Sequence, residues 1–236
     1  MSKLLAHCVA RVGRREALLE ALAAAARDWA EQRGLRTALF EARSKDPLRC
    51  SGEGQPLPRA FDASLEAVAA EDGDDVEALV AAAGDLGARL TGLVHADLCA
   101  ALVGRDRVFV ECPPTEVRYQ YCMRRRPDWS HADYLVRYAE GHSPIGVRTQ
   151  GKRGYRQLHV DLDTSARAGE AAGFGVRAVD SVAQLELESL ETFLAAGREN
   201  AQLGAAEDEE QFVDRAASVM WVSDVIARCQ PRQSPR

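Results

Sequence analysis

The stretch that decides the fold is Glu111-Cys112-Pro113-Pro114-Thr115-Glu116, which places two adjacent prolines near the middle of the 236-residue chain. Proline restricts its own backbone and that of the residue before it, so this stretch is a stiff and very short joint. The same order of elements is expected before it and after it. Two independent domains on a linker are the alternative, but so short a joint favours two halves that pack directly on each other.

The first half is predicted to run β-α-β-β-α-β. Leu18, Leu22 and Trp29 recur at helical spacing in residues 14–33, and Gly34 ends that helix. A second helix is expected at 74–90, where acidic residues occupy the first turn and suit the helix dipole. Strands are expected at 3–12, 35–43, 60–69 and within 96–110, with a loop at 44–58.

The second half is predicted to repeat that order. Ser130 and Asp133 form an N-terminal capping box for a helix at 130–140, and Trp129 can pack on Tyr134. A further helix follows Ser189, and a short helical piece is expected at 207–215. Strands are expected at 117–125, 154–162, 176–187 and 216–227.

The fold class that follows is α+β, with tandem ferredoxin-like units. A four-stranded antiparallel sheet with helices on one face leaves its other face bare, and two such sheets packed face to face bury both bare faces. We therefore expect a barrel-like pseudo-dimer within one chain. The expected divisions are a first unit at 1–112, a second at 116–228 and a flexible tail at 229–236.

Composition narrows the class of partner. Hydrophobic residues make up 46% and charged residues 28%, and the net charge of -6 argues against nucleic acid or an anionic membrane. His7 and Arg11 interrupt the apolar start that a signal peptide would need, so a cytoplasmic location is expected. The six cysteines show no C-x-x-C pair, which indicates reduced thiols.

Residues 119–222 resemble an EthD-type domain of the dimeric α+β barrel superfamily. The resemblance is carried by six pieces in order, which are Arg118-Tyr119-Gln120-Tyr121, Trp129-Ser130-His131-Ala132-Asp133-Tyr134, Gly141-His142-Ser143-Pro144, Gly154-Tyr155-Arg156-Gln157-Leu158-His159-Val160, Val179-Asp180-Ser181-Val182-Ala183 and the acidic Glu207-Asp208-Glu209-Glu210-Gln211-Phe212-Val213-Asp214. The first half matches in element order only and looks like a diverged copy. The resemblance implies a pocket between the sheet and the helices of one unit. It also implies a protein that works without metal or organic cofactor.

His142 is the first candidate catalytic residue. Its imidazole suits proton transfer to or from an acidic carbon or hydroxyl near neutral pH. The alternative is that His142 caps the last carbonyls of the helix at 130–140.

Tyr119 and Tyr121 are the other candidate catalytic residues. They alternate on one strand face, where phenols can hold a substrate oxygen or a developing enolate. Core packing is at least as good an explanation for both. The candidate substrate-binding residues are His159, Trp221, Tyr138 and Tyr155, although Tyr138 and Trp221 fit a core role better.

No cofactor and no metal site are expected. The five histidines show no H-E-x-x-H motif, and the chain has no Walker A run and no G-x-S-x-G elbow. The leading hypothesis is a cofactor-independent lyase, cyclase or isomerase acting by general acid–base catalysis on an aromatic, polyketide-like or terpenoid-like substrate. A cofactor-free monooxygenase and a non-catalytic binding or accessory protein stay open as alternatives. The expected partner is a small organic molecule, and a homodimer is possible.

Overall fold

The computed structural model describes residues 1–48, 50–51, 61–69, 75–176 and 178–231. The elements of its first half are β1 (Ser2–Cys8), α1 (Arg15–Gln32), β2 (Leu35–Ala42), β3 (Cys50–Ser51), β4 (Ala63–Ala69), α2 (Val76–Arg89), the 3₁₀ turn η1 (Ala96–Leu98) and β5 (Ala100–Val110). The predicted strands and helices of this half are confirmed with shifted ends. The loop expected at 44–58 is interrupted by β3, and its residues 49 and 52–58 lie outside the described part.

The second half departs further from expectation. Its elements are β6 (Val117–Met123), α3 (His131–Val136), the π-helical segment η2 (Arg137–His142), α4 (Ser143–Arg148), β7 (Lys152–Val160), α5 (Leu162–Ala172), β8 (Ser181–Leu187), α6 (Leu190–Ala195), α7 (Gly197–Ala201), α8 (Ala205–Glu209) and β9 (Val219–Cys229). Helix α5 was not predicted, and the short helix expected at 207–215 ends at Glu209. Cys229, the first residue of the expected tail, is instead the last residue of β9, where it pairs with Thr37. Residues 232–236 lie outside the described part.

Eight strands close into one antiparallel barrel in the order β2-β4-β1-β5-β7-β8-β6-β9, and β9 pairs back on β2. The expected α+β barrel is confirmed, but its two halves are not two sheets packed face to face, because they join edge to edge at β5–β7 and β2–β9. Edge strands carry unpaired backbone groups, and closure satisfies them without a second chain.

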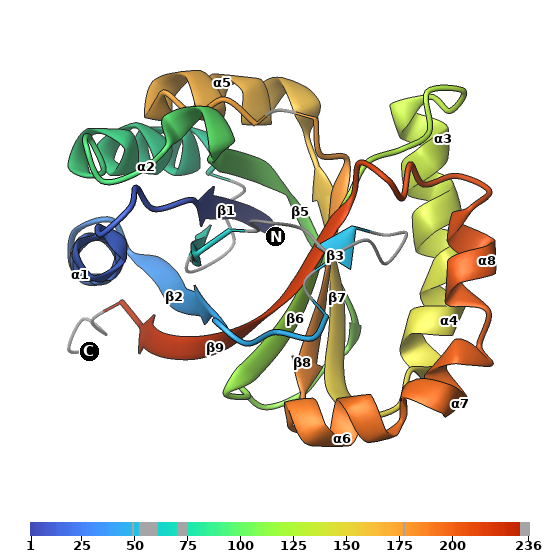
Figure 1. The fold of residues 1–236 in the computed structure, drawn as a ribbon. Coiled ribbons are helices and arrows are strands. Elements are labelled where there is room, and N and C mark those ends of the chain that lie inside the picture. The colour runs from blue at the N-terminus through green and yellow to red at the C-terminus, as the bar shows by residue number, and fades with distance from the viewer. Residues whose placement is uncertain (49, 52–60, 70–74, 177, 232–236) are drawn as a thin grey trace, which may run out of the picture.

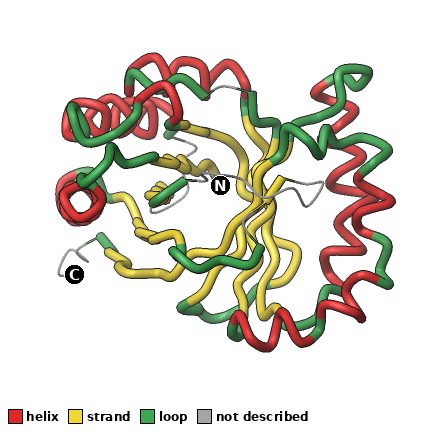
Figure 2. The backbone as a smooth tube through the Cα atoms, viewed as in Figure 1, coloured by secondary structure: helices red, strands yellow, loops and turns green. Residues whose placement is uncertain are grey.

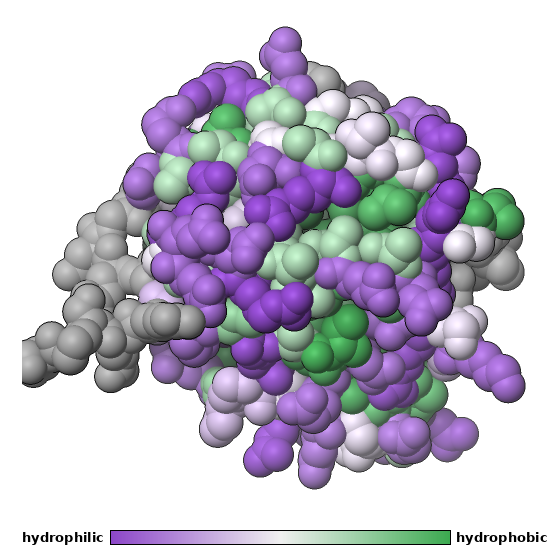
Figure 3. Space-filling view, turned by 90° about the vertical axis from the view of Figure 1, so that its left-hand side faces the viewer, coloured by the Kyte–Doolittle hydropathy of each residue, from purple (hydrophilic) through white to green (hydrophobic). Residues whose placement is uncertain are grey.

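Helices cover the barrel in two groups. Figure 1 shows α1, α2 and α5 on one side and α3, α4 and α6 to α8 on the other, and Figure 2 shows the strands between these two groups. Helix α5 follows β7 in sequence but packs on α2 and β5, where Ala168 and Ala172 join the core of the first half. The outward face on that side is largely hydrophilic, with hydrophobic spots between (Figure 3).

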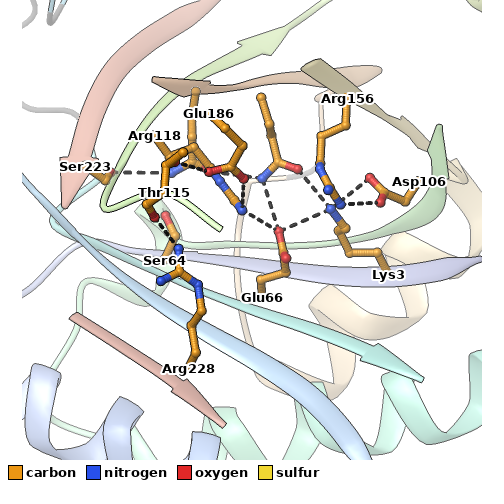
Figure 4. Close-up of polar contacts among 12 residues, drawn as sticks. Lys3, Ser64, Glu66, Asp106, Thr115, Arg118, Arg156, Glu186, Ser223 and Arg228 are labelled. Carbon is orange, nitrogen blue, oxygen red and sulfur yellow. Dashed lines mark hydrogen bonds and ion pairs between the residues drawn. The ribbon is translucent and has the colours of Figure 1, made fainter. Parts of the chain in front are cut away.

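Charged side chains occupy the interior of the barrel, where the two halves meet (Figure 4). Three cations and three carboxylates form the cluster, which we call the interior ion network: Lys3, Arg118, Arg156, Glu66, Asp106 and Glu186. Arg118 Nη1 lies 2.7 Å from Glu66 Oε2, and its Nη2 contacts Glu186. Burial raises the pKa of Glu66, but the charges of Arg118 and Lys3 outweigh it, and the pKa lies far below its usual value.

The network crosses the boundary between the halves. Lys3 Nζ donates to Gln184 Oε1 at 3.0 Å, and Arg156 Nη1 lies 2.9 Å from Asp106. The three positive and three negative charges balance, which is the condition under which buried charges are tolerated.

In the described part of the chain, no helix is long and apolar enough to cross a membrane.

Candidate active site beneath the helices of the second half

Four of the predicted residues, Tyr119, Tyr121, Tyr155 and His159, share the sheet face that the second-half helices cover. Tyr121 pairs with Ala183, and Ala183 pairs with Gln157, so these side chains form one row across β6, β8 and β7. Tyr119 and Tyr155 belong to the next row through Leu185. The alternation inferred from the sequence is therefore confirmed for Tyr119 and Tyr121.

The helical segment above this face places three side chains at intervals of four residues. Ser130 accepts a hydrogen bond from the Asp133 N–H, which confirms the capping box that starts α3. The rings of Tyr134 and Tyr138 stack with centroids 6.0 Å apart, and Tyr138 stacks on His142 at 5.7 Å. The segment does not end near Glu140, as predicted, because it continues through a π turn into α4. His142 is therefore not a terminal cap, and π turns often mark functional sites.

His142 is held between two carboxylates of α8. Its Nδ1 lies 2.8 Å from Asp208 Oδ2, and its Nε2 lies 3.8 Å from Glu209 Oε1. Arg137 forms an ion pair with Asp208, which fixes that carboxylate on the far side of the ring. Burial lowers the pKa of His142, and the hydrogen bond to Asp208 opposes that shift. A neutral imidazole whose Nδ1–H donates to Asp208 leaves Nε2 free to accept a proton.

Glu209 is the most perturbed acid of the site. Its side chain is nearly enclosed, and burial raises its pKa to about 7, against the positive charge of Arg215. The Tyr121 hydroxyl donates to Glu209 Oε2 at 3.4 Å, and Arg215 Nε lies 3.7 Å from the same oxygen. Burial, with a contribution from Glu209, raises the pKa of Tyr121. A carboxyl group that titrates near neutrality beside a histidine is suited to general acid–base work.

A second polar chain runs along β7. His159 Nε2 lies 2.8 Å from Gln157 Oε1, and Gln157 Nε2 donates to the Tyr155 hydroxyl at 2.5 Å. Burial lowers the pKa of His159 to about 4. Burial, with a contribution from the adjacent Tyr155 hydroxyl, raises the pKa of the Tyr138 hydroxyl.

Trp221 lies apart from these residues. It pairs with Gln120 on the opposite face of the sheet, inside the barrel, where its ring contacts His7 and Phe61. The prediction that it lines the same site as Tyr119 and Tyr121 was wrong, because side chains alternate along β9 and Met220 and Val222 take the outer face. Tyr119 lies at the margin of the site, where its hydroxyl contacts Met220 Sδ at 3.3 Å.

The space predicted as a pocket is filled by aromatic side chains. Tyr134, Tyr138 and Phe212 are fully buried between the sheet and the helix, and Phe212 lies edge-on to His142. Two open clefts border this packing. One, of about 650 Å³, runs along Arg126, Pro127, Asp128, Glu210, Val213, Asp214 and Arg215, and the other lies over the outer face of α3 beside Gly141. Arg215 connects the first cleft to Glu209.

Sequence reasoning missed three members of the site. Asp208, Glu209 and Arg215 were not proposed as functional residues, although the acidic stretch from Glu207 to Asp214 was part of the family resemblance. Its charges read as a solvated helix face, whereas the structure buries Glu209 beneath them. No group of three or more His, Cys, Asp or Glu side chains within the described ranges is arranged to hold a metal ion.

Comparison with known proteins bears on the family and the fold. The EthD domain family matches residues 126–216. The fold of the whole chain is similar to an anthrone oxidase-like protein, with a TM-score of 0.60 and 9% identity over 98% of this chain and 93% of that one. It is also similar to a candidate monooxygenase from Lactobacillus acidophilus, with a TM-score of 0.52 and 7% identity over 97% of this chain and 95% of that one. A third similar structure is a candidate monooxygenase from Fusobacterium nucleatum, with a TM-score of 0.53 and 11% identity over 97% of this chain and 94% of that one.

These low identities support a shared fold and nothing finer, and no curated protein sequence matches the chain. The family match covers the segment that carries Tyr134, Tyr138, His142, Asp208 and Glu209. Residues 126–216 are therefore similar to the EthD domain family, and the whole chain shares its fold with these solved structures.

Proposed function

We propose that this protein is a small-molecule enzyme that transfers protons by general acid–base catalysis at His142 and Glu209. The supporting observation is the placement of His142 between Asp208 and Glu209, with Tyr121 hydrogen-bonded to the second carboxyl. The substrate class that fits is an acidic ketone or phenol with an aromatic, polyketide-like or terpenoid-like skeleton. The reaction is of the lyase, cyclase or isomerase type and needs no organic cofactor.

Each side chain has a role in this scheme. Asp208 orients the imidazole, so that His142 Nε2 removes a proton from the substrate carbon or hydroxyl. Glu209, with its pKa near 7, returns a proton to the product. The hydroxyls of Tyr121 and Tyr138 donate to the substrate oxygen on which charge develops. Tyr119, Tyr155 and His159 form the surrounding wall.

Access to the site requires a local movement. Phe212 covers His142, and Val213 and Arg215 border the open cleft beyond it. Displacing the Phe212 ring toward this cleft would open a path for a flat substrate to His142 and to the Tyr138 hydroxyl. Positioned proton transfer of this kind contributes about a hundredfold to ten-thousandfold in rate.

A cofactor-free monooxygenase is the second candidate, because an enolate made by the same residues is the form of a substrate that reacts with oxygen. The names of three similar structures, an anthrone oxidase-like protein and two candidate monooxygenases, support this second candidate. The third candidate is a non-catalytic accessory role, which the closed aromatic packing around His142 supports. We also propose that each half is a ferredoxin-like unit. The strand orders β2-β4-β1-β5 and β7-β8-β6-β9 support this, because the two halves follow the same order. A homodimer stays a prediction.

Anthrone provides a direct test, because its methylene protons are acidic and its oxidation is easily followed. Under nitrogen in D₂O, the enzyme should speed deuterium incorporation at the methylene carbon, followed by NMR. Substitution of His142 or Glu209 by glutamine should remove most of this acceleration without lowering the melting temperature. His95→Gln, a half-buried histidine of the first half, is the matched control.

Admitting oxygen separates the two enzymatic candidates. Stoichiometric uptake of one O₂ with release of anthraquinone and water, dependent on His142, would favour the monooxygenase. Exchange no faster than buffer, under nitrogen or air, would contradict catalysis on this substrate class. A His142→Gln protein that fails to fold would instead assign that residue a structural role.

A further inference from the structure

Two cysteines of the first half face each other across neighbouring strands. The antiparallel ladder between β1 and β5 runs to the pair His7 and Ala100, and the next opposed positions are Cys8 and Cys99. Both side chains are fully buried in the first-half core. Directly opposed residues of an antiparallel pair bring their Cβ atoms to about 4.5–5.5 Å, the range from which a disulfide can close with a small adjustment.

The two thiols are not equivalent. Cys99 Sγ accepts a hydrogen bond from the Val9 N–H at 3.3 Å and donates to the His95 carbonyl at 3.3 Å. The Cys8 thiol also donates to the Cys99 sulfur, which raises the pKa of Cys8 and lowers the pKa of Cys99. Two donors that converge on one sulfur stabilise its thiolate, the reactive form.

Cys99 is itself fully buried, but it directly follows the turn η1, whose Asp97 and Leu98 are exposed. The other cysteines whose side chains are described lack this arrangement. Burial raises the pKa of Cys122 and of Cys112, whereas the pKa of Cys99 is lowered.

We propose that Cys8 and Cys99 are a reversible oxidation site, at which a hydroperoxide closes a disulfide between β1 and β5. The Cys99 thiolate attacks one peroxide oxygen, the O–O bond breaks, and the products are the sulfenic acid of Cys99 and hydroxide. The Cys8 thiol then attacks the Cys99 sulfur, an S–S bond forms, and the sulfenic oxygen leaves as water. The two thiols are oxidised by two electrons, and one hydrogen peroxide is reduced to two waters.

The crosslink would close a loop of roughly 90 residues that contains α1, β2, β4 and α2. Because it removes conformational freedom from the unfolded chain, oxidation should raise the melting temperature by about 5 to 10 °C. Dithiothreitol should reverse the shift. This inference does not depend on the proposed function.

The test treats the reduced, folded protein with a few equivalents of hydrogen peroxide, blocks the remaining thiols and maps the peptides by mass spectrometry. A peptide linked through Cys8 and Cys99, with two thiols lost and the melting temperature raised, is the expected result. In Cys8→Ala the sulfenic acid should persist on Cys99 and be trapped by dimedone. Cys112→Ala, which removes a half-buried thiol outside the pair, should behave as wild type.

Two outcomes would overturn the proposal. One is oxidation of Cys112 or Cys229 while Cys8 and Cys99 stay reduced. The other is a linked peptide that forms only after unfolding in urea, which would show that the native geometry does not favour the bond. If Cys8→Ala fails to fold, the wild-type peptide map alone decides the question.

Discussion

Removing Arg118 should be among the most damaging single changes inside the barrel. Its guanidinium bridges Glu66 and Glu186, and its side chain is 6% exposed. After Arg118→Met, Glu66 would keep Lys3 Nζ at 3.2 Å and Gln184 Nε2 at 3.3 Å. Glu186 would keep only the Thr115 hydroxyl at 2.7 Å, a neutral partner. The substitution therefore leaves a buried carboxylate without a cation.

The expected cost is about 3–5 kcal/mol of unfolding free energy, the range for breaking a buried pair from one side. Most of that cost comes from the uncompensated charge on Glu186, and a smaller part comes from the loss of the cation–π contact between the Arg118 guanidinium and the Phe40 ring. Adding Glu186→Gln to Arg118→Met neutralises that charge. The double variant should therefore recover about 2 kcal/mol relative to the single one.

The assay is urea unfolding at pH 7 followed by tryptophan fluorescence, with the slope against urea checked for constancy. Arg167→Met is the matched control, since Arg167 makes an exposed ion pair with Glu77 on the outer surface. Removing that pair should change the unfolding free energy by no more than the error of the measurement. The reasoning fails if Arg118→Met costs no more than this control. It also fails if the double variant is no more stable than Arg118→Met alone.

Two further predictions concern helix packing and pH. Gly87→Ala should destabilise the protein by about 1–3 kcal/mol in urea, because its new Cβ would overlap the backbone of Ala172 on α5, whereas Gly84→Ala meets only ordinary contacts at 3.5 Å and should be neutral or slightly stabilising. Equal stabilities for the two variants would contradict the close approach of α2 and α5. Glu209 has a raised folded pKa, so its contribution is fully present below its unfolded pKa of 4.5 and is lost as the pH rises to about 7. Wild type should therefore lose stability relative to Glu209→Gln between pH 4.5 and 7, and parallel profiles would refute the assignment.

Much of the fold could be predicted because local signals and hydrophobic periodicity agree. The N-cap at Ser130 placed the start of α3 correctly, since its hydrogen bond from the Asp133 N–H is local and needs no tertiary context. Helix α5 was missed because its buried face carries only small residues, Ser165, Ala168, Gly169 and Ala172, which form no apolar stripe. Its start was nevertheless readable, because Asp161 accepts from the Thr164 N–H as an N-cap.

The candidate site was harder to predict than the fold. Gly141 and Pro144 indicated a helix end, but the π turn carries the chain past Gly141 and sets Pro144 in the first turn of α4, where proline is tolerated. The interior ion network could not be predicted from the sequence, for a different reason. Lys3, Glu66 and Arg118 alternate with apolar residues, as they would on a strand with a solvated face, and only barrel closure turns that face inward.

The two halves of the barrel are built for different tasks, and the placement of α5 explains why. The outer sheet face of the first half, under α1 and α2, presents Leu4, Leu39 and Leu65, which pack into one apolar cluster with Ala168 of α5. Its histidine, His7, points into the barrel and bonds Ser64 at 2.7 Å. In the second half, α5 has crossed to the partner sheet, so the outer face is covered by α3, α4 and the short helices around α8. Those helices bring Asp208 and Glu209 over the strands at the position where the first half has its apolar cluster. On the function proposed above, the apolar half is the rigid frame, and the half covered by short segments is the one that opens for a substrate.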